Sequence, residues 1–131
     1  MSRRRFLEDC VVRLVNQERE TAGLAALPTE ERLRQSSRTH SEAMAVRDFF
    51  AHLDPDGTSP ADRMRVAGHP FPGAENMAVH LPNALEVVRA WMASPGHRVN
   101  ILGPDFRAIG AGLFRERGDR LGWWTQNFGY V

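Results

Sequence analysis

The stretch 107–131, RAIGAGLFRERGDRLGWWTQNFGYV, decides the fold class of this chain. It contains two runs of strand-forming residues, 107–115 and 121–129, joined by the polar segment RERGDR. Two such runs with a short polar connection are typical of an antiparallel hairpin. Both runs also contain glycines, which allow another element to pack close against a strand, at positions 110, 112, 122 and 129. The sequence therefore predicts a chain that ends in a small antiparallel sheet.

Helical patterns dominate the first half of the chain. One apolar face predicts an amphipathic helix that ends at Gly23, with Leu7, Val11, Leu14 and Val15 on it. In a second helix, Thr29 is the predicted N-cap. Its buried stripe holds Leu33, Ser37, His40 and Met44. This second helix is therefore expected to bury a histidine.

Capping signals predict two further helices and one helical turn. Ser59 followed by Pro60 begins a short third helix that ends at Gly68, and Asn83 caps a fourth helix. The apolar face of the fourth helix is predicted to hold Leu85, Val88, Trp91 and Met92. The pair Ser94-Pro95 repeats the cap-plus-proline signal, so PGHRVNIL is expected to form one more helical turn. AENMAV is expected to form another strand.

These elements indicate an α+β fold in which helices cover a small antiparallel sheet. The 131 residues, 42% of them hydrophobic, suffice for one domain, predicted to span residues 1–131. Seventeen basic residues against 16 acidic ones give a net charge of +1, and the arginines are scattered among acids. This pattern is not typical of a protein that binds nucleic acid or a membrane surface.

The single cysteine and the N-terminal arginines carry limited information. Cys10 excludes an intrachain disulfide, and we expect it to be a small buried residue of the first helix. SRRRFL, residues 2–7, matches the start of a twin-arginine export signal, but charged residues follow where an apolar run is required. The chain as given is therefore expected to contain no signal peptide, and without 18 consecutive apolar residues it is expected to contain no transmembrane segment.

Five stretches resemble, in order and spacing, the bacterial branch of the CAP superfamily, which holds cysteine-rich secretory proteins, antigen 5 and plant pathogenesis-related proteins. They are LVNQERETAGLAAL, THSEAMAVRDFFAHLDPDGTSPADRM, GAENMAV, AWMASPGHRVNIL and IGAGL…WWTQNFG, and the resemblance covers about residues 7–129. It implies a three-layer α-β-α sandwich with a polar groove, and an extracellular or cell-envelope location. No enzymatic activity is generally accepted for this family.

The resemblance also implies which residues line the groove. His52 in FFAHLDPDG matches the first family histidine, and Glu75 in GAENMA matches the glutamate of the GEN motif. Trp123 stands where many members have a second histidine. His97, in the SPGHR stretch shared by bacterial members, is expected to supply the second imidazole. Two imidazoles and a carboxylate suit Zn²⁺ or another divalent cation, and they suit equally a proton-transfer pair with an orienting acid.

Each histidine also has a simpler interpretation. His52 can cap the DPDG turn, His97 can cap its helical turn or face solvent, and Glu75 can bind backbone amides instead of a ligand. His40 is expected to be a core residue of the second helix, while His69 and His80, in loops near prolines, are expected to be exposed. The three tryptophans, Trp91, Trp123 and Trp124, are expected in the core or in the groove wall.

No motif indicates serine or cysteine nucleophile chemistry, nucleotide binding or a His-Glu-x-x-His metal site. The leading hypothesis is therefore a binding module whose groove holds a divalent cation or another small ligand. Its partner is expected to be a small ligand, a lipid or a cell-envelope component. A metal-dependent hydrolase that uses the same groove is the alternative. A structural interaction domain with a vestigial groove is a third hypothesis.

Overall fold

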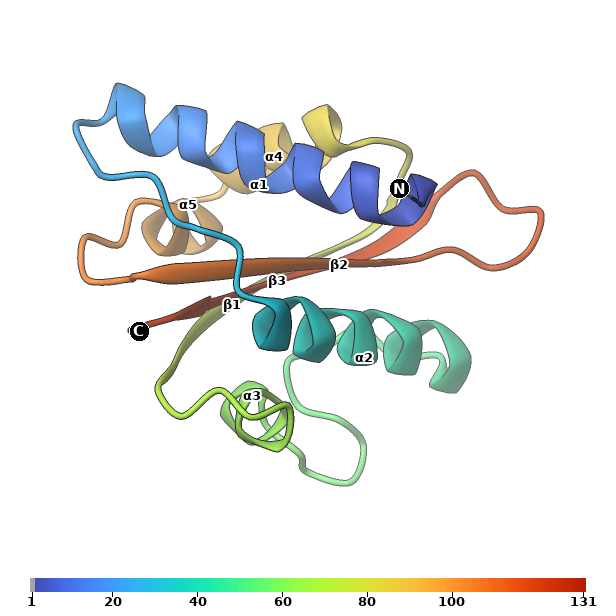
Figure 1. Ribbon diagram of the computed structural model, residues 1–131. Helices are drawn as coiled ribbons and strands as arrows, with labels where there is room; N and C mark the ends of the chain where they lie inside the picture. Colours follow the sequence, from blue (N-terminus) through green and yellow to red (C-terminus); the bar gives the residue numbers. More distant parts are fainter. Residues whose placement is uncertain (1) are drawn as a thin grey trace.

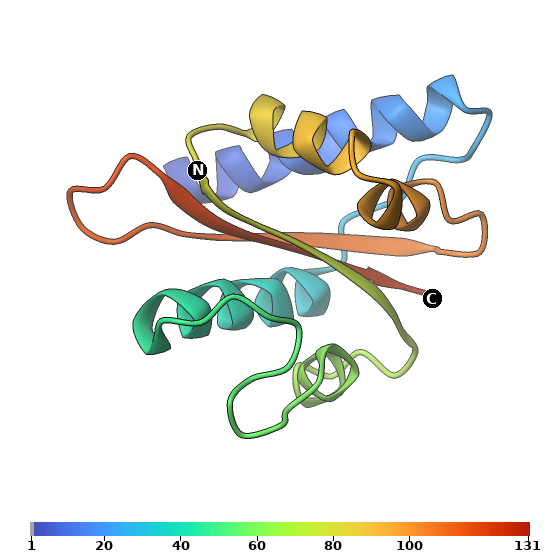
Figure 2. The ribbon, with the colours of Figure 1, turned by 180° about the vertical axis from the view of Figure 1, so that it is seen from behind.

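A computed structural model describes residues 2–131, which form three layers around one sheet. Helices α1 (Arg3–Thr21), α4 (Ala84–Met92) and α5 (Pro95–Ile101) lie on one side of the sheet, and α2 (Glu31–Arg47) and α3 (Pro60–Val66) lie on the other (Figure 1). The reverse view shows the same separation of the helices (Figure 2). The predicted α-β-α sandwich is confirmed.

The sheet consists of β1 (Pro72–Leu81), β2 (Ala108–Phe114) and β3 (Gly122–Gly129). All neighbours are antiparallel and the order is β1-β3-β2, so β3 is central and the predicted C-terminal hairpin is present. The register places Glu75 opposite Asn127 and Asn76 opposite Gln126. Because side chains alternate along a strand, Glu75 and Asn76 point to opposite faces of the sheet. This alternation decides which layer each of them contacts.

The two faces of the sheet differ in chemistry. Toward α1 and α4, Trp124 and Phe128 of β3 join a large apolar core with Val11, Val15 and Trp91. Toward α2 the buried groups are largely polar, and the predicted stripe of α2 is confirmed because its four members are all fully buried. A polar interior of this kind is stable only when its groups are hydrogen-bonded to one another, so it specifies their positions closely.

Two glycines of β2 allow α2 to lie directly on the sheet. A Cβ at Gly112 would stand 2.7 Å from Arg38 Cα and still closer to other backbone atoms of α2, and Gly110 has the same constraint. The hydroxyls of Ser37 and Ser41 donate to the carbonyls of Gly110 and Gly112 at 3.0 and 2.9 Å. The predicted close packing against this strand is therefore confirmed, with α2 as the partner.

Most predicted helix ends are confirmed. Ser59 and Asp62 form a reciprocal capping box, and the Asn83 side chain accepts from the Glu86 amide. The predicted N-cap Thr29 is wrong, because Thr29 forms a β-bridge with Ile109 and the helix is capped by Glu30, whose carboxylate accepts from the Leu33 amide. In α4, Leu85 is exposed and Val87 is buried in its place, because the helix turns a slightly different face to the core.

The outer edge of β2 is covered by side chains and by the segment before α2. Glu8 accepts a hydrogen bond from the Leu113 amide at 2.9 Å, and Arg4 donates to the Leu113 carbonyl at 2.6 Å. Glu8 is itself fully buried and paired with Arg34 and Arg38 of α2. This group ties α1 to α2 around the edge of the sheet.

Cys10 is partly buried against the apolar core, so its predicted place in the first helix is correct and its predicted full burial is wrong. It lies at the margin of the interface between α1 and the core rather than at its centre. Across residues 2–131 we find no helix that combines the length and the apolarity needed to cross a bilayer.

Candidate functional site

The candidate site is organised around Glu75 of β1. Its carboxylate is almost completely buried and faces the layer of α2 and α3. Oε1 lies 2.9 Å from His52 Nδ1, Oε2 accepts from Asn127 Nδ2 at 2.9 Å, and Arg63 Nη2 donates to both oxygens at 3.1 and 3.0 Å. Both oxygens of the carboxylate are therefore already engaged by protein groups.

Arg63 connects α3 to the loop that follows α2. Besides Glu75, its guanidinium donates to Asp54 Oδ1 at 2.8 Å and to the His52 carbonyl at 2.8 Å. The capping box of Ser59 and Asp62 starts α3 one turn earlier and so directs Arg63 into the interior. Asp54 and Arg63 also line a cavity of about 420 Å³ between α2 and α3, which does not include His52 or His97.

His40 of α2 belongs to the same cluster. Its Nε2 lies 2.8 Å from the Ala51 carbonyl and 3.8 Å from Glu75 Oε1, and its Nδ1 lies 3.3 Å from Asp54 Oδ1. The prediction that His40 is a core residue is confirmed, but it also borders the site. Burial lowers the pKa of His40, since the opposing charge of Glu75 only partly compensates for lost hydration.

Several charges hold Glu75 ionised. Its burial opposes ionisation, but the hydrogen bond from His52 and the charges of Arg63 and His40 outweigh this, so the pKa of Glu75 lies below its ordinary value. A carboxylate in this state is a weak proton acceptor. It is suited to orient His52 through Nδ1.

His52 sits at the surface of the cluster. Its side chain is 51% exposed, although its Nδ1 is bound to the buried Glu75. The ring therefore has one nitrogen fixed by the protein, and its Nε2 has no hydrogen-bond partner among the described residues. The alternative that His52 caps the DPDG turn with its ring is not what the structure describes, since the ring binds Glu75 instead.

His97 approaches the outer edge of β1 from α5. Its Nδ1 lies 2.9 Å from Ser94 Oγ, and its backbone carbonyl accepts from Asn76 at 3.1 Å. Asn100, one turn further along, donates to Asn76 at 2.9 Å and approaches the Glu75 carbonyl at 3.4 Å. Burial and the proximity of His52 lower the pKa of His97, so its ring is neutral at neutral pH.

Two of the three predicted residues are in direct contact, and the third reaches the same strand from α5. His52 binds Glu75 through its ring, whereas His97 makes its described hydrogen bonds to Ser94 through its ring and to Asn76 through its backbone carbonyl. Within residues 2–131, no three His, Cys, Asp or Glu side chains are grouped as they would be around a metal ion. Because Glu75 is saturated by its contacts, the residues do not fit a metal site with all three as ligands, and metal binding stays a prediction for the two imidazoles.

Among the remaining histidines, the predictions for His69 and His80 need correction. His69 is fully buried, so its predicted exposure is wrong: the ring fills space against Gly129, with Nδ1 3.6 Å from Glu30 Oε2. His80 is exposed as predicted but belongs to β1 and not to a loop, and it lies edge-on to the partly buried Trp123, with ring centroids 5.5 Å apart. Trp123 lies in the central strand β3, and it supplies no imidazole at the position where many family members have a histidine.

Sequence reasoning missed Arg63, Asp54 and Asn127 as members of this cluster. For His40 a signal existed, because an imidazole on a buried stripe requires polar partners. For Arg63 and Asp54 no pattern in the sequence distinguishes them from solvated charges. Their roles follow from the packing of α3 against β1.

Comparisons with known proteins agree with this architecture. The sequence profile of the cysteine-rich secretory protein family, CAP, matches residues 12–128. The uncharacterized protein YkwD of Bacillus subtilis is 43% identical over 122 residues, which cover 92% of this chain and 46% of that protein. The chain thus spans less than half of that relative's length.

Solved structures show the same fold. An extracellular protein containing an SCP domain from Bacillus anthracis superposes with a TM-score of 0.87 at 25% identity, over 98% of this chain and 41% of that one. An outer surface protein from Borrelia burgdorferi superposes with a TM-score of 0.83 at 20% identity, over 92% of this chain and 90% of that one. By its family match and its fold, the chain belongs to the cysteine-rich secretory protein (CAP) family and is of the bacterial type.

Proposed function

We propose that this protein is a binding module that acts outside the cell or in the cell envelope, and that it binds its ligand through the imidazoles of His52 and His97. The observation that carries the proposal is the 2.9 Å contact between the half-exposed His52 ring and the buried Glu75 carboxylate. A buried acid that fixes one nitrogen of an exposed imidazole leaves the other nitrogen free and correctly oriented for a ligand.

A divalent transition metal is the first ligand to test. Imidazole nitrogen suits Zn²⁺, Cu²⁺ and Ni²⁺, and ligating histidines usually donate their second ring N–H to a carboxylate or another oxygen. Glu75 has this orienting role toward His52, and Ser94 Oγ has it toward His97. In this proposal Glu75 positions a ligand-binding group and does not itself bind the ion.

The same contacts weigh against the alternative of a metal-dependent hydrolase. A general base needs a free oxygen and a pKa near the working pH. Glu75 has its oxygens engaged by Arg63, Asn127 and His52, and its pKa is lowered. Binding without chemistry is therefore the function that this geometry supports best.

The location outside the cell is supported by relatives. The Bacillus anthracis neighbour is described as an extracellular protein and the Borrelia burgdorferi neighbour as an outer surface protein. A module of this type is expected to meet its ligand, lipid or envelope component on the outer side of the cell membrane.

The test is isothermal titration of untagged protein with Zn²⁺, Cu²⁺ and Ni²⁺. We expect His52→Ala and His97→Ala each to abolish binding, while His80→Ala, which removes an exposed imidazole elsewhere, leaves it unchanged. Glu75→Gln is expected to weaken binding by about 10- to 100-fold, as for other groups that orient a metal ligand. Circular dichroism checks that each variant is folded.

Metal binding is also expected to stabilise the fold. An ion at about 100 times its Kd that binds only the folded chain adds about 2.7 kcal/mol to the free energy of unfolding. Acidification through the histidine range should weaken binding, because a protonated imidazole cannot ligate. Equal binding by the wild-type protein and both His→Ala variants, or no binding of any of the three ions, would contradict the metal proposal.

A further inference from the structure

Two segments from opposite ends of the sequence lie side by side at one end of the molecule. The first turn of α1 adjoins the hairpin between β2 and β3 in both ribbon views (Figures 1 and 2). Two adjacent cavities open there, of about 470 and 320 Å³, and both are lined by Arg3 and Arg115. Arg120 completes the larger cavity, and Arg4 belongs to the smaller one. No residue of the candidate site around Glu75 lines either cavity.

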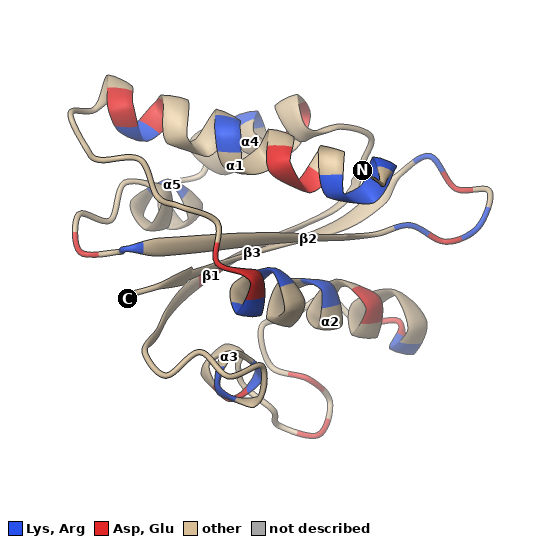
Figure 3. Cartoon of the chain, viewed as in Figure 1, with Lys and Arg blue, Asp and Glu red and all other residues tan. Residues whose placement is uncertain are grey.

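The cavities are strongly cationic. Four arginines and no acidic residue line them, and the colouring by charge shows arginine on both the first turn of α1 and the hairpin (Figure 3). Arg4 is used internally, by Glu8 and the Leu113 carbonyl. The salt bridges among residues 2–131 include none from Arg3, Arg115 or Arg120. Three guanidinium groups are therefore not neutralised by the protein.

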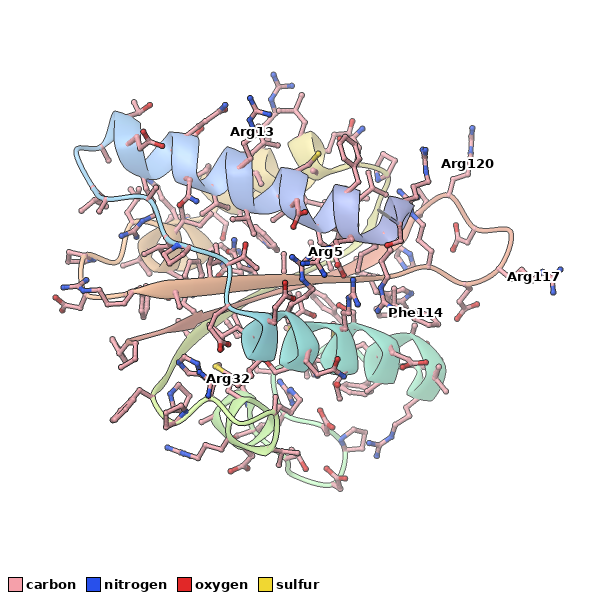
Figure 4. All side chains as sticks on the ribbon, in the orientation of Figure 1. Arg5, Arg13, Arg32, Phe114, Arg117 and Arg120 are labelled. Carbon is pink, nitrogen blue, oxygen red and sulfur yellow. The ribbon has the colours of Figure 1, made fainter. Side chains whose placement is uncertain are left out.

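Glu8 contacts two groups that line the smaller cavity, Arg4 and the Leu113 amide, but it is already paired with Arg34 and Arg38. The turn of the hairpin contains two further acids, Glu116 and Asp119. Asp119 accepts a hydrogen bond from the Leu121 amide, and Glu116 accepts from the Asp119 amide through its backbone carbonyl. Neither carboxylate lines the cavities. Figure 4 shows Arg117 at the tip of the hairpin, pointing away from the molecule, with Arg120 on the return segment. Neither the Glu116 nor the Asp119 carboxylate forms an ion pair with an arginine of the cavities among the described residues.

The guanidinium of Arg115 is held in place by a hydrogen bond, but some of its donors have no partner among the described residues. Its Nη2 donates to the Pro82 carbonyl at 2.7 Å, whereas its Nε is buried and has no partner among the described residues. A buried donor without a partner costs free energy, and such cases in folded proteins call for an explanation. Its Nη1 likewise has no partner among the described residues, so a guanidinium held in place by Pro82 retains a donor for an anionic ligand.

The wall of the smaller cavity is apolar. It contains Leu7, Leu113 and the half-buried Phe114, which lies at the base of the hairpin (Figure 4). Pro82 and Leu121 add apolar surface to the larger cavity. A ligand that fits both parts has an anionic group on the arginines and an apolar group beside it.

We propose that these cavities bind a phosphate ester, with its phosphate on Arg3, Arg115 and Arg120 and its apolar group against Leu7 and Phe114. Guanidinium groups pair with phosphate oxygens through two parallel hydrogen bonds, and several guanidinium groups match a phosphate better than a single-charge carboxylate. The phosphate belongs either to a soluble ester or to the headgroup of an anionic phospholipid. The site is independent of the proposed function of His52 and His97.

The test uses the full chain with phenyl phosphate, inorganic phosphate and vesicles. The site variant is Arg3→Gln/Arg120→Gln, whose side chains make no described salt bridge. The control variant is Arg13→Gln/Arg89→Gln, which removes the same charge from exposed positions on α1 and α4. We expect phenyl phosphate to bind the wild-type protein and the control equally, and to bind the site variant at least about 10-fold more weakly.

The vesicle arm distinguishes the two sources of phosphate. Co-sedimentation with vesicles that contain phosphatidylglycerol, but not with pure phosphatidylcholine, assigns the site to a lipid headgroup if the site variant alone loses it. Binding of phenyl phosphate without vesicle binding assigns it to a soluble ester. Equal losses in the two variants show a non-specific effect of net charge, and that result, or no binding of any probe, overturns the proposal.

Discussion

Replacing Arg63 with methionine removes the arginine that is paired with both the buried Glu75 and the partly buried Asp54. Methionine approximates the length of the arginine stem, so the change removes charge and hydrogen bonds with little loss of volume. The hydrogen bonds to Glu75, Asp54 and the His52 carbonyl are lost together. Glu75 is then left without an arginine partner, whereas Asp54 keeps a contact with Arg47 at 3.8 Å.

The expected loss in the free energy of unfolding is about 3 to 5 kcal/mol at pH 7.5. Removing one partner of a buried ion pair costs about this much, because the remaining charge stays desolvated. Glu75 is almost completely buried, so solvent cannot replace Arg63. The exposed Arg65, two residues further along α3, provides the matched control, and Arg65→Met is expected to change stability by less than about 0.5 kcal/mol.

The loss should shrink at acidic pH. In the wild-type protein the pKa of Glu75 is lowered, so this group stabilises the fold above its ordinary pKa of 4.5 and this contribution disappears as the pH falls. Without Arg63, burial raises the pKa of Glu75, and protonation relieves the unpaired charge. The difference between wild type and variant is therefore larger at pH 7.5 than at pH 4.5.

Urea unfolding followed by tryptophan fluorescence measures this difference, because Trp91 and Trp124 are buried in the core. The slope with urea must match between proteins for the free energies to be compared. A loss below about 1 kcal/mol, or one that is the same at both pH values, would refute the view that Arg63 compensates Glu75.

Three other outcomes follow from the same structure. Gly112→Ala is expected to cost about 2 to 4 kcal/mol in urea unfolding, since its Cβ meets the backbone of α2, whereas Gly96→Ala, with open space around it in α5, should be neutral or stabilising by up to about 1 kcal/mol. Wild-type stability should fall as the pH drops below 6.5, because the lowered pKa of His40 means that the unfolded chain takes up a proton first; a flat profile between pH 7 and 5 would count against this. Cys10 should react with a thiol reagent more slowly in the native protein than in urea, though not be fully protected, and equal rates in both would show that its contact with the core is absent.

Local signals were sufficient where neighbours in the sequence decide the outcome. The capping box at Ser59 and the cap at Asn83 act over three residues, and the two runs of strand-forming residues with their polar connection predict the C-terminal hairpin. The pairing of His52 with Glu75 was predictable only through the family resemblance, because they are 23 positions apart in the sequence. No periodic pattern links residues so far apart.

The predictions that were wrong concern residues whose surroundings are set by the packing of segments far apart in the sequence. His69 was expected at the surface because a proline follows it, but the packing of its loop over Gly129 buries the ring. The arginines looked scattered along the chain, yet the fold brings Arg3 next to Arg115 and Arg120. A charge pattern read along the sequence therefore underestimates charge that is concentrated in space.

The cover over the outer edge of β2 has a consequence for how copies of this domain behave when crowded together. An exposed edge strand is a template onto which a second chain can add its own strand, the first step of many aggregation reactions. Here the outward amide and carbonyl of Leu113 are taken by Glu8 and Arg4, and those of Ile109 by residues Pro28 and Glu30. An incoming strand would have to displace a buried carboxylate and its arginine partners before it could bond to Leu113. One of the two edges of this three-stranded sheet, that of β2, is thereby covered from within the chain.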